Sequence, residues 1–119
     1  MRVKDAVGRF GEQRAVERLV ADGLTIIERN WRCADGELDI VAQESDTLVF
    51  VEVKTRSSVA FGDPAEAVQP VKAARVRRLA VRWLVEHPEP YWPQIRFDVV
   101  AVVRRGPDGL TVRHLRGAF

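Results

Sequence analysis

Three polar residues near the middle of the chain have the types and the spacing to do chemistry with a divalent cation. They are Asp39, in "GELDIVA", and Glu52 and Lys54, in "LVFVEVKTR". Side chains alternate along a strand, so Glu52 and Lys54 would share one face with the apolar Leu48 and Phe50. An ionised carboxylate is costly to remove from water unless it is paired or metal-bound. Lys54 could be that partner, and a surface Glu–Lys pair is the simplest interpretation.

The neighbouring strand argues for a cation instead. Alternation there places Leu38 and Ile40 on one face and Asp39 and Val41 on the other. A loop of two or four residues between the strands would put Asp39 opposite Glu52 on the same face, whereas a three-residue loop would separate them. Two carboxylates in directly opposed positions repel each other, and a structural role gains nothing from that repulsion. A divalent cation explains it, since Mg²⁺ is typically held by one or two carboxylates and several waters.

A third acid belongs to the first predicted helix. Glu12 has helical spacing with Ala15, Val16 and Leu19 and therefore projects from the core-facing side. The neighbouring glycines, including Gly11, permit close approach of the backbone. An acid near the start of a helix is also a favourable partner of the helix dipole and needs no further role.

The second predicted helix carries further polar groups. Lys72 shares a face with Val76 and Trp83, one turn before the apolar stripe, and Gln69 lies nearby. Ordinary solvation at a helix start is the alternative for both. An adjacent face is cationic and contains Arg75, Arg78 and Arg82.

The elements that would position these groups can be predicted from periodicity and turn residues. We expect a helix over residues 5–22 that stops at Gly23, and three strands over 24–33, 37–43 and 48–56, with a turn at Asp35–Gly36. A loop over 57–64 leads to a helix over 65–86 whose apolar face includes Val68. A strand over 95–105 and a short edge strand over 110–116 follow. The order α-β-β-β-α-β-β predicts one α/β domain over residues 1–119, with a mixed central β-sheet flanked by helices.

Composition limits the available chemistry. The chain has 119 residues, of which 46% are hydrophobic and 30% charged, as expected of a globular domain. One cysteine, Cys33, excludes an internal disulfide, and two distant histidines, His87 and His114, offer little for a catalytic triad or a histidine metal site. No segment predicts a membrane helix or signal peptide, so we expect a cytoplasmic protein without a membrane partner.

The basic residues are mostly arginine. The net charge is only +2, but arginines outnumber lysines 16 to 3, and residues 72–82 contain five cations and no acid. Arginine suits bidentate contact with phosphate. A solvated helix face with an arginine-rich composition explains the same pattern equally well.

The combined pattern resembles a known family. Asp39, followed after twelve residues by Glu52-Val53-Lys54, resembles the D…ExK signature of the PD-(D/E)xK nuclease superfamily. The segments "GRFGEQRA", "RNWRCADGELDIVA", "LVFVEVKTR", "AVQPVKAARV" and "RFDVVAV" resemble, in this order, the YraN-like family of bacterial predicted endonucleases, which are relatives of archaeal Holliday-junction resolvases. The resemblance covers about residues 8–103 and shows no departure at the acidic positions.

The resemblance implies a restriction-endonuclease-like, or resolvase-like, fold and a role for each matching residue. Asp39, Glu52 and the carbonyl of Val53 would hold Mg²⁺ or Mn²⁺, with Glu12 as an extra or water-mediated ligand. Lys54 would orient or activate the attacking water and stabilise charge on the phosphate. Gln69 and Lys72 resemble auxiliary residues of the superfamily. Arg32 and Arg56 look like contacts for the DNA backbone, beside the helical arginines.

These expectations define a leading function and two alternatives. The first is a metal-dependent endodeoxyribonuclease that acts on duplex, branched or damaged DNA, and as resolvases work as dimers, a homodimer is expected with it. The second is a nucleic-acid-binding protein that has the nuclease-like fold but no catalysis. The third is a small accessory protein whose acids form internal salt bridges.

Overall fold

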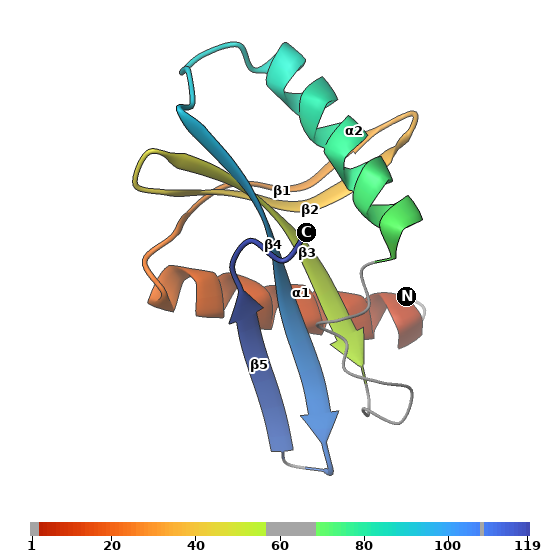
Figure 1. The fold of residues 1–119 in the computed structure, drawn as a ribbon. Coiled ribbons are helices and arrows are strands. Elements are labelled where there is room, and N and C mark those ends of the chain that lie inside the picture. Colours follow the sequence, from red (N-terminus) through yellow and green to blue (C-terminus); the bar gives the residue numbers. More distant parts are fainter. Residues whose placement is uncertain (1–2, 57–68, 108) are drawn as a thin grey trace.

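The residues that the structure describes form two helices and five strands in the predicted order (Figure 1). The computed structural model describes residues 3–56, 69–107 and 109–119. Within these ranges the elements are α1 (Val3–Ala21), β1 (Thr25–Cys33), β2 (Gly36–Glu44), β3 (Thr47–Arg56), α2 (Pro70–Glu86), β4 (Gln94–Arg105) and β5 (Gly109–Leu115). The mixed α/β architecture and the element order predicted from the sequence are therefore confirmed.

The five strands form one sheet in the order β1-β2-β3-β4-β5. Three of the four strand pairs are antiparallel, and only β3 and β4 run parallel. Parallel neighbours need a long crossover connection, which here contains α2. Strand β3 is central, but its pairing with β2 ends at Val51, so its polar end is paired only with β4.

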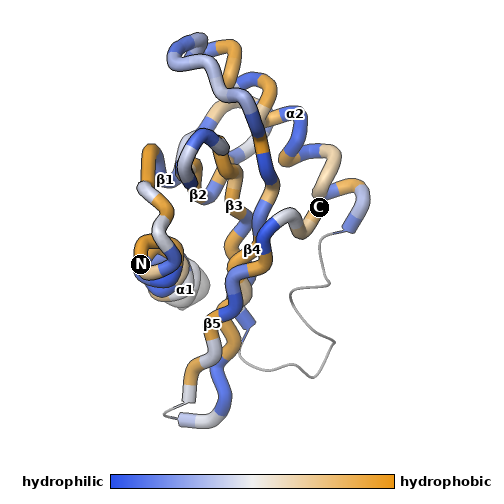
Figure 2. Tube along the Cα trace, turned by 60° about the vertical axis from the view of Figure 1, so that its left-hand side comes forward, coloured by the Kyte–Doolittle hydropathy of each residue, from blue (hydrophilic) through white to orange (hydrophobic). Residues whose placement is uncertain are grey.

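The two helices cover opposite faces of the sheet (Figure 2). On the α1 side, Ala15 and Leu19 pack against Ile40, Val49 and Val51 in one apolar cluster. On the α2 side, a second cluster combines residues from α2 and three strands, among them Val41, Leu48, Phe50, Val76, Leu79 and Trp83. No helix in the described ranges is long and apolar enough to cross a membrane.

The α1 helix ends close to its predicted boundary. Gly23 has a φ of +96°, and the amides of Gly23 and Leu24 donate to the carbonyls of Val20 and Leu19 at 3.0 and 2.9 Å. Helices commonly end at a residue with positive φ, where the amides that follow the helix donate to carbonyls of its last turn. Glycine adopts this conformation without steric cost. The chain then turns directly into β1.

The α2 helix begins later than predicted. Gln69 is extended, with φ −64° and ψ 148°, and Pro70 is the first helical residue. Proline disfavours helical geometry in the preceding residue and suits the first turn itself, which explains the boundary. The predicted stretch 65–68, including Val68, and the predicted loop 57–64 lie outside the described residues. The predicted apolar face from Val76 to Trp83 is buried, as expected.

Candidate active site

The hairpin of β2 and β3 places Asp39 and Glu52 next to each other. Glu44 pairs with Thr47, so the loop has two residues, and the register runs to Ile40 opposite Val51. Asp39 and Glu52 are the next residues on the two strands. The amide of Val53 donates to Asp39 Oδ2 at 2.9 Å, which fixes the Asp39 carboxylate beside β3. The two-residue loop is one of the two lengths from which this juxtaposition was predicted.

One detail of β2 differs from simple alternation. Leu38 packs in the α2-side cluster, whereas Ile40 packs in the α1-side cluster, so the two residues do not share a face as predicted. On the neighbouring strand β1, Asn30 has a φ of +55° and lies between Arg29 and Trp31, which pair with Ile40 and Leu38. The backbone irregularity of β1 is therefore directly beside Asp39.

Two lysines surround Glu52. Lys72 Nζ lies 2.6 Å from Glu52 Oε1, and Lys54 Nζ lies 3.9 Å from the same atom. The Glu52 side chain is only 9% exposed, so it needs compensating charge. The sequence suggested Lys54 as the partner, but Lys72, which comes from α2, is the closer one. The site therefore combines one strand hairpin with the first turn of α2.

The Asp39 carboxylate titrates unusually. Burial and the neighbouring charge of Glu52 raise the pKa of Asp39 to about 7, although the hydrogen bond from Val53 opposes the shift. The charge of Glu37 raises this pKa further, and that of Lys72 lowers it. A carboxylate whose charged form is disfavoured by another acid is a common property of metal and catalytic sites.

The pKa values of the two lysines are shifted in opposite directions. Burial and the proximity of Lys72 lower the pKa of Lys54 to about 8, although Glu52 opposes that change. Burial also opposes the charged form of Lys72, but its hydrogen bonds with Glu52 and Lys54 outweigh burial and raise its pKa. Lys72 is therefore the fixed cation of the pair, and Lys54 is the group that can lose a proton near neutral pH.

Glu12 is held away from the two carboxylates. Its Oε1 atom accepts hydrogen bonds from Arg29 Nε at 3.1 Å and Asn30 Nδ2 at 2.8 Å. Within the described ranges, no group of three or more acidic, histidine or cysteine side chains is arranged to hold a metal ion. The three predicted acids are therefore not gathered into one cluster. Glu12 lies in the middle of α1 rather than near its start, so its partner is Arg29 and not the helix dipole.

The α1 helix nevertheless approaches the end of β3 closely. Gly11 is buried, and a Cβ atom at this position would overlap Thr55 Oγ1. Gly8, by contrast, faces open space. The close approach predicted for the glycines beside Glu12 is therefore made by Gly11, next to the residue that follows Lys54.

The remaining predicted residues surround the site at the surface. Gln69 is exposed and caps α2 only through its carbonyl, which accepts from the Ala73 amide at 2.9 Å. Arg32 Nε lies 3.4 Å from Glu37 Oε2, and Arg56 is exposed at the end of β3.

The three predicted arginines of α2 are of two kinds. Arg82 contacts Asp35 and Glu86, whereas Arg75 and Arg78 are exposed and have no partner among the described residues.

The donor set of Asp39 and Glu52 fits a hard divalent cation. Two neighbouring carboxylates are the kind of ligands that Mg²⁺ takes while it keeps several waters. Lys72 Nζ lies against Oε1 of Glu52. The residues present would thus hold such an ion with two carboxylates rather than with three.

Sequence reasoning missed two features. Glu37, two residues before Asp39, adds charge to the site, and its place on the same strand face was the available signal. A second polar network surrounds Asp98, which is fully buried and contacts Arg96 and His114. An acid directly before the apolar run of residues 99–103 was its signal. Its partner His114 is 16 residues further along the chain, on the neighbouring strand β5, so nothing local indicated the contact.

These features define an α/β domain with a pair of carboxylates and a pair of lysines at the junction of β2, β3 and α2. The chain belongs to the uncharacterised protein family UPF0102, whose family model matches residues 11–102. UPF0102 is the YraN family, so the family resemblance of the sequence is confirmed, while the family description assigns no activity.

Several relatives match over their whole length. A UPF0102 protein of Beutenbergia cavernae is 59% identical over 117 residues, which cover 98% of each chain. UPF0102 proteins of Parafrankia sp. and Frankia casuarinae are 58% and 56% identical and are covered completely, as is this chain. The matched family region contains every residue of the candidate site.

Proposed function

We propose that this UPF0102 protein is a metal-dependent endonuclease of the PD-(D/E)xK type that hydrolyses DNA phosphodiester bonds. The observation that carries the proposal is the juxtaposition of Asp39 and Glu52 on adjacent strands, with Lys54 and Lys72 beside them. Such a placement weakens a purely structural site through like-charge repulsion but suits phosphoryl chemistry, which needs acids to hold a cation and a positive group for the developing charge.

Each residue has a role that its position supports. Asp39, Glu52 and the carbonyl of Val53 would hold Mg²⁺ or Mn²⁺, which supplies polarisation of the phosphate and acidification of water when bound. Lys54, with its pKa of about 8, would orient the attacking water and exchange a proton near neutral pH. Lys72 would hold Glu52 in place, and its positive charge would help to lower the pKa of Lys54. Glu12 would act indirectly, by fixing Arg29 and Asn30 beside Asp39.

The substrate follows from the surrounding charge. Arg75 and Arg78 on α2 and Arg56 at the end of β3 are exposed and suited to contact the phosphate backbone. We propose duplex or branched DNA, of the kind cut by Holliday-junction resolvases, as the substrate. A homodimer would cut two strands symmetrically, and a cytoplasmic location fits such a substrate.

One observation favours a second candidate. The 2.6 Å contact between Lys72 and Glu52 is a complete ion pair in itself, as expected of a nucleic-acid-binding protein that keeps the fold without catalysis. In that case Glu52 would stabilise the junction of β3 and α2, and added metal would bind nowhere in the site. An accessory protein with only internal salt bridges would bind neither metal nor DNA.

Cleavage and metal binding together test the proposal. Labelled linear duplex, single strand, flap, splayed arm and four-way junction would be incubated with Mg²⁺, Mn²⁺ or EDTA. We expect cleavage with either metal and none with EDTA. Asp39→Asn and Glu52→Gln should each abolish cleavage but leave DNA affinity nearly unchanged or raised, because each removes a cation ligand and one negative charge.

A matched control and a second readout make the outcome decisive. Glu37→Gln removes a nearby charge of the same kind, on the same strand as Asp39, and should retain most cleavage. Mg²⁺ should raise the melting temperature of the wild type but not that of Asp39→Asn, since a ligand stabilises only the state that binds it. DNA binding without cleavage on any substrate, with no thermal effect of either metal, would favour the non-catalytic candidate.

A further inference from the structure

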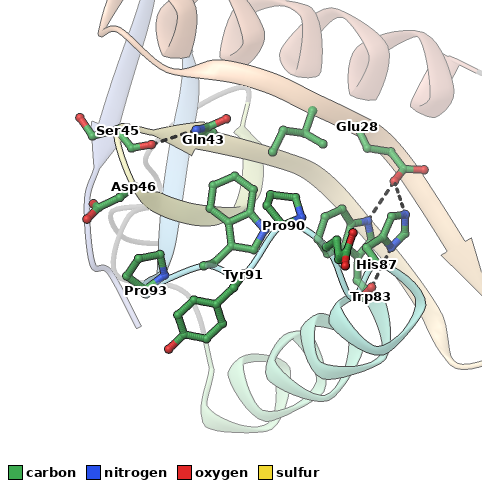
Figure 3. A pocket seen from close by; sticks show the side chains of 12 residues that line it. Glu28, Gln43, Ser45, Asp46, Trp83, His87, Pro90, Tyr91 and Pro93 are labelled. Atoms are coloured by element: carbon green, nitrogen blue, oxygen red, sulfur yellow. Dashed lines mark hydrogen bonds and ion pairs between the residues drawn. The ribbon is translucent and has the colours of Figure 1, made fainter.

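A pocket of about 760 Å³ lies between the β2–β3 turn and the C-terminal end of α2 (Figure 3). Its walls come from β1, the β2–β3 turn, the end of α2 and the segment that leads to β4. The turn residue Asp46 precedes β3, so Glu52 lies about 20 Å further along the strand at 3.3 Å per residue. Along α2, Lys72 and the pocket residue Trp83 are about 17 Å apart at 1.5 Å per residue. On the β1 side the pocket comes closer, because its lining residue Glu28 pairs with Val41, two residues along β2 from Asp39. None of the four charged residues of the candidate active site lines the pocket.

Aromatic side chains form much of this pocket. The rings of Trp83 and His87 stack with centroids 3.9 Å apart, and Trp83 Nε1 donates to Glu28 Oε1 at 2.9 Å. This arrangement fixes one wall. Trp92 also lines the pocket, and Tyr91 points outward at the rim, where it is 85% exposed. An aromatic side chain that gains almost nothing from the core is typical of a surface that binds something.

The charge of the pocket is opposite to that of the chain. Glu28, Asp46 and Glu89 line it, and the described residues contribute no lysine or arginine to the lining, although the chain has 19 such residues and a net charge of +2. The carboxyl end of α2 adds the partial negative charge of a helix C-terminus. A phosphate backbone would be repelled here, whereas a cation would be attracted.

We propose that this pocket binds an arginine-bearing segment of a partner protein. A guanidinium can stack on Trp92 or Tyr91 and form bidentate hydrogen bonds to Glu28 or Glu89, which no single hydrophobic or acidic ligand can do. The exposed Ile27 and Tyr91 beside the pocket give the residues next to that arginine an apolar surface to cover. The inference goes beyond the proposed nuclease activity and does not depend on it.

The chain contains a convenient set of reporters. Its three tryptophans give three indole N–H signals in a ¹⁵N-correlated NMR spectrum. Trp83 and Trp92 line the pocket, whereas Trp31 is buried and does not line it. The probe is the peptide acetyl-Gly-Leu-Arg-Leu-Arg-Gly-amide, added to the full-length protein. We expect saturable shifts of the Trp83 and Trp92 signals, with that of Trp31 unchanged. The same peptide with citrulline in place of arginine keeps the shape but not the charge and should bind at least tenfold more weakly.

Variants and competing probes complete the test. Glu28→Gln combined with Glu89→Gln should weaken binding at least tenfold, while Glu86→Gln, an acid of the same region outside the pocket, should leave it unchanged. Tyr91→Ala should weaken binding without affecting the fold, because Tyr91 is exposed. Equal binding of the citrulline peptide, no response of the two indoles, or binding of free arginine amide as tight as that of the peptide would each overturn the proposal. Shifts of the same two indoles by a DNA hairpin would overturn it in favour of nucleic acid.

Discussion

At the scale of single residues, the candidate site depends on how four charges share a small space. Asp39 and Glu52 are held together by the hairpin, and Lys72 lies against one oxygen of Glu52. Burial of Lys54 and the second cation beside it together explain why its pKa is lowered. Lys72 therefore keeps its positive charge, whereas Lys54 can lose a proton near neutral pH. This difference between the two lysines could not be predicted from the spacing of Glu52 and Lys54 alone.

A substitution of Lys72 tests directly whether its charge lowers the pKa of Lys54. In the metal-free protein, Lys54 should titrate near pH 8, and in Lys72→Met its pKa should rise toward the ordinary value because a neighbouring positive charge has been removed. NMR titration of the lysine side chains is practical, since the chain has only three lysines. The third lysine, Lys4, provides the reference titration. An unchanged Lys54 pKa in Lys72→Met would show that burial alone causes the shift.

At the scale of elements, the approach of α1 to β3 positions the end of the site. Gly11 lets the helix backbone pass against Thr55, the neighbour of Lys54, while Gly8, one turn earlier, faces open space. The two glycines therefore serve different purposes in the same helix, although the sequence presents them as a similar pair.

Alanine substitutions should separate the two glycines. Gly11→Ala should destabilise the protein by about 1–3 kcal/mol, because the new Cβ collides with Thr55 and the helix must move outward. Gly8→Ala should instead stabilise it by about 0.5–1 kcal/mol, since alanine favours the helix where space permits. Urea unfolding of both variants measures the difference. Equal effects of the two substitutions would contradict the close packing of α1 on β3.

The elements were predictable where the signals are local. Alternation and turn residues identified the strands, and the two-residue loop fixed the register that brings Asp39 to Glu52. The start of α2 was predicted too early, because helical periodicity outweighed the effect of Pro70 on Gln69. The turn between β1 and β2 lies at Ala34–Asp35, one residue earlier than predicted, since Gly36 already pairs with Cys33. Long-range contacts such as Lys72 with Glu52 depend on how α2 crosses the sheet, which no local pattern specifies.

At the scale of the whole molecule, a buried polar network joins segments that are distant in the sequence. Asp98 accepts hydrogen bonds from Arg96 and from the Gly117 amide, and His114 Nε2 lies 2.7 Å from it. His114 also contacts Asp22 at the end of α1, at 2.9 Å. One fully buried carboxylate thus ties β4, β5, the C-terminal residues and α1 together.

Removal of this carboxylate should lower the free energy of unfolding and make it depend less on pH under acidic conditions. The hydrogen bonds from His114 and Arg96 outweigh burial and lower the pKa of Asp98 to about 2. A lowered folded-state pKa contributes stability above the unfolded-state value near 4, which is lost as pH falls toward 2. Asp98→Asn should therefore cost about 3–5 kcal/mol at pH 7, as expected for breaking a buried pair, and should show a shallower loss of stability between pH 5 and 2. Chemical denaturation across this range measures both effects.

An exposed ion pair provides the comparison for Asp98. Glu86 is exposed and contacts Arg82 at 3.4 Å, so Glu86→Gln should change the stability by less than about 0.5 kcal/mol at any pH in this range. If Asp98→Asn were as mild as Glu86→Gln, the network would not hold the C-terminal residues to the sheet.

The charge distribution over the molecule determines how it would hold DNA. Arg75 and Arg78 are exposed and have no ionic partner among the described residues, whereas Arg82, on the same helix, already contacts Asp35 and Glu86. Only the first two can neutralise phosphates without first breaking an ion pair. Arg75→Ala combined with Arg78→Ala should therefore weaken binding uniformly across DNA sequences and reduce the slope of log K against log salt by about 2, since each phosphate contact contributes about 0.9.

Arg82→Ala is the matched control for this double substitution, because it removes a cation from the same helix whose charge is already balanced. Its effect on the salt slope should be clearly smaller than half of that of the double variant. Fluorescence anisotropy with a labelled four-way junction between 50 and 300 mM salt would measure all three proteins. An unchanged slope in the double variant would remove α2 from the interface and leave Arg32 and Arg56, at the ends of β1 and β3, as the residues through which DNA reaches Asp39 and Glu52.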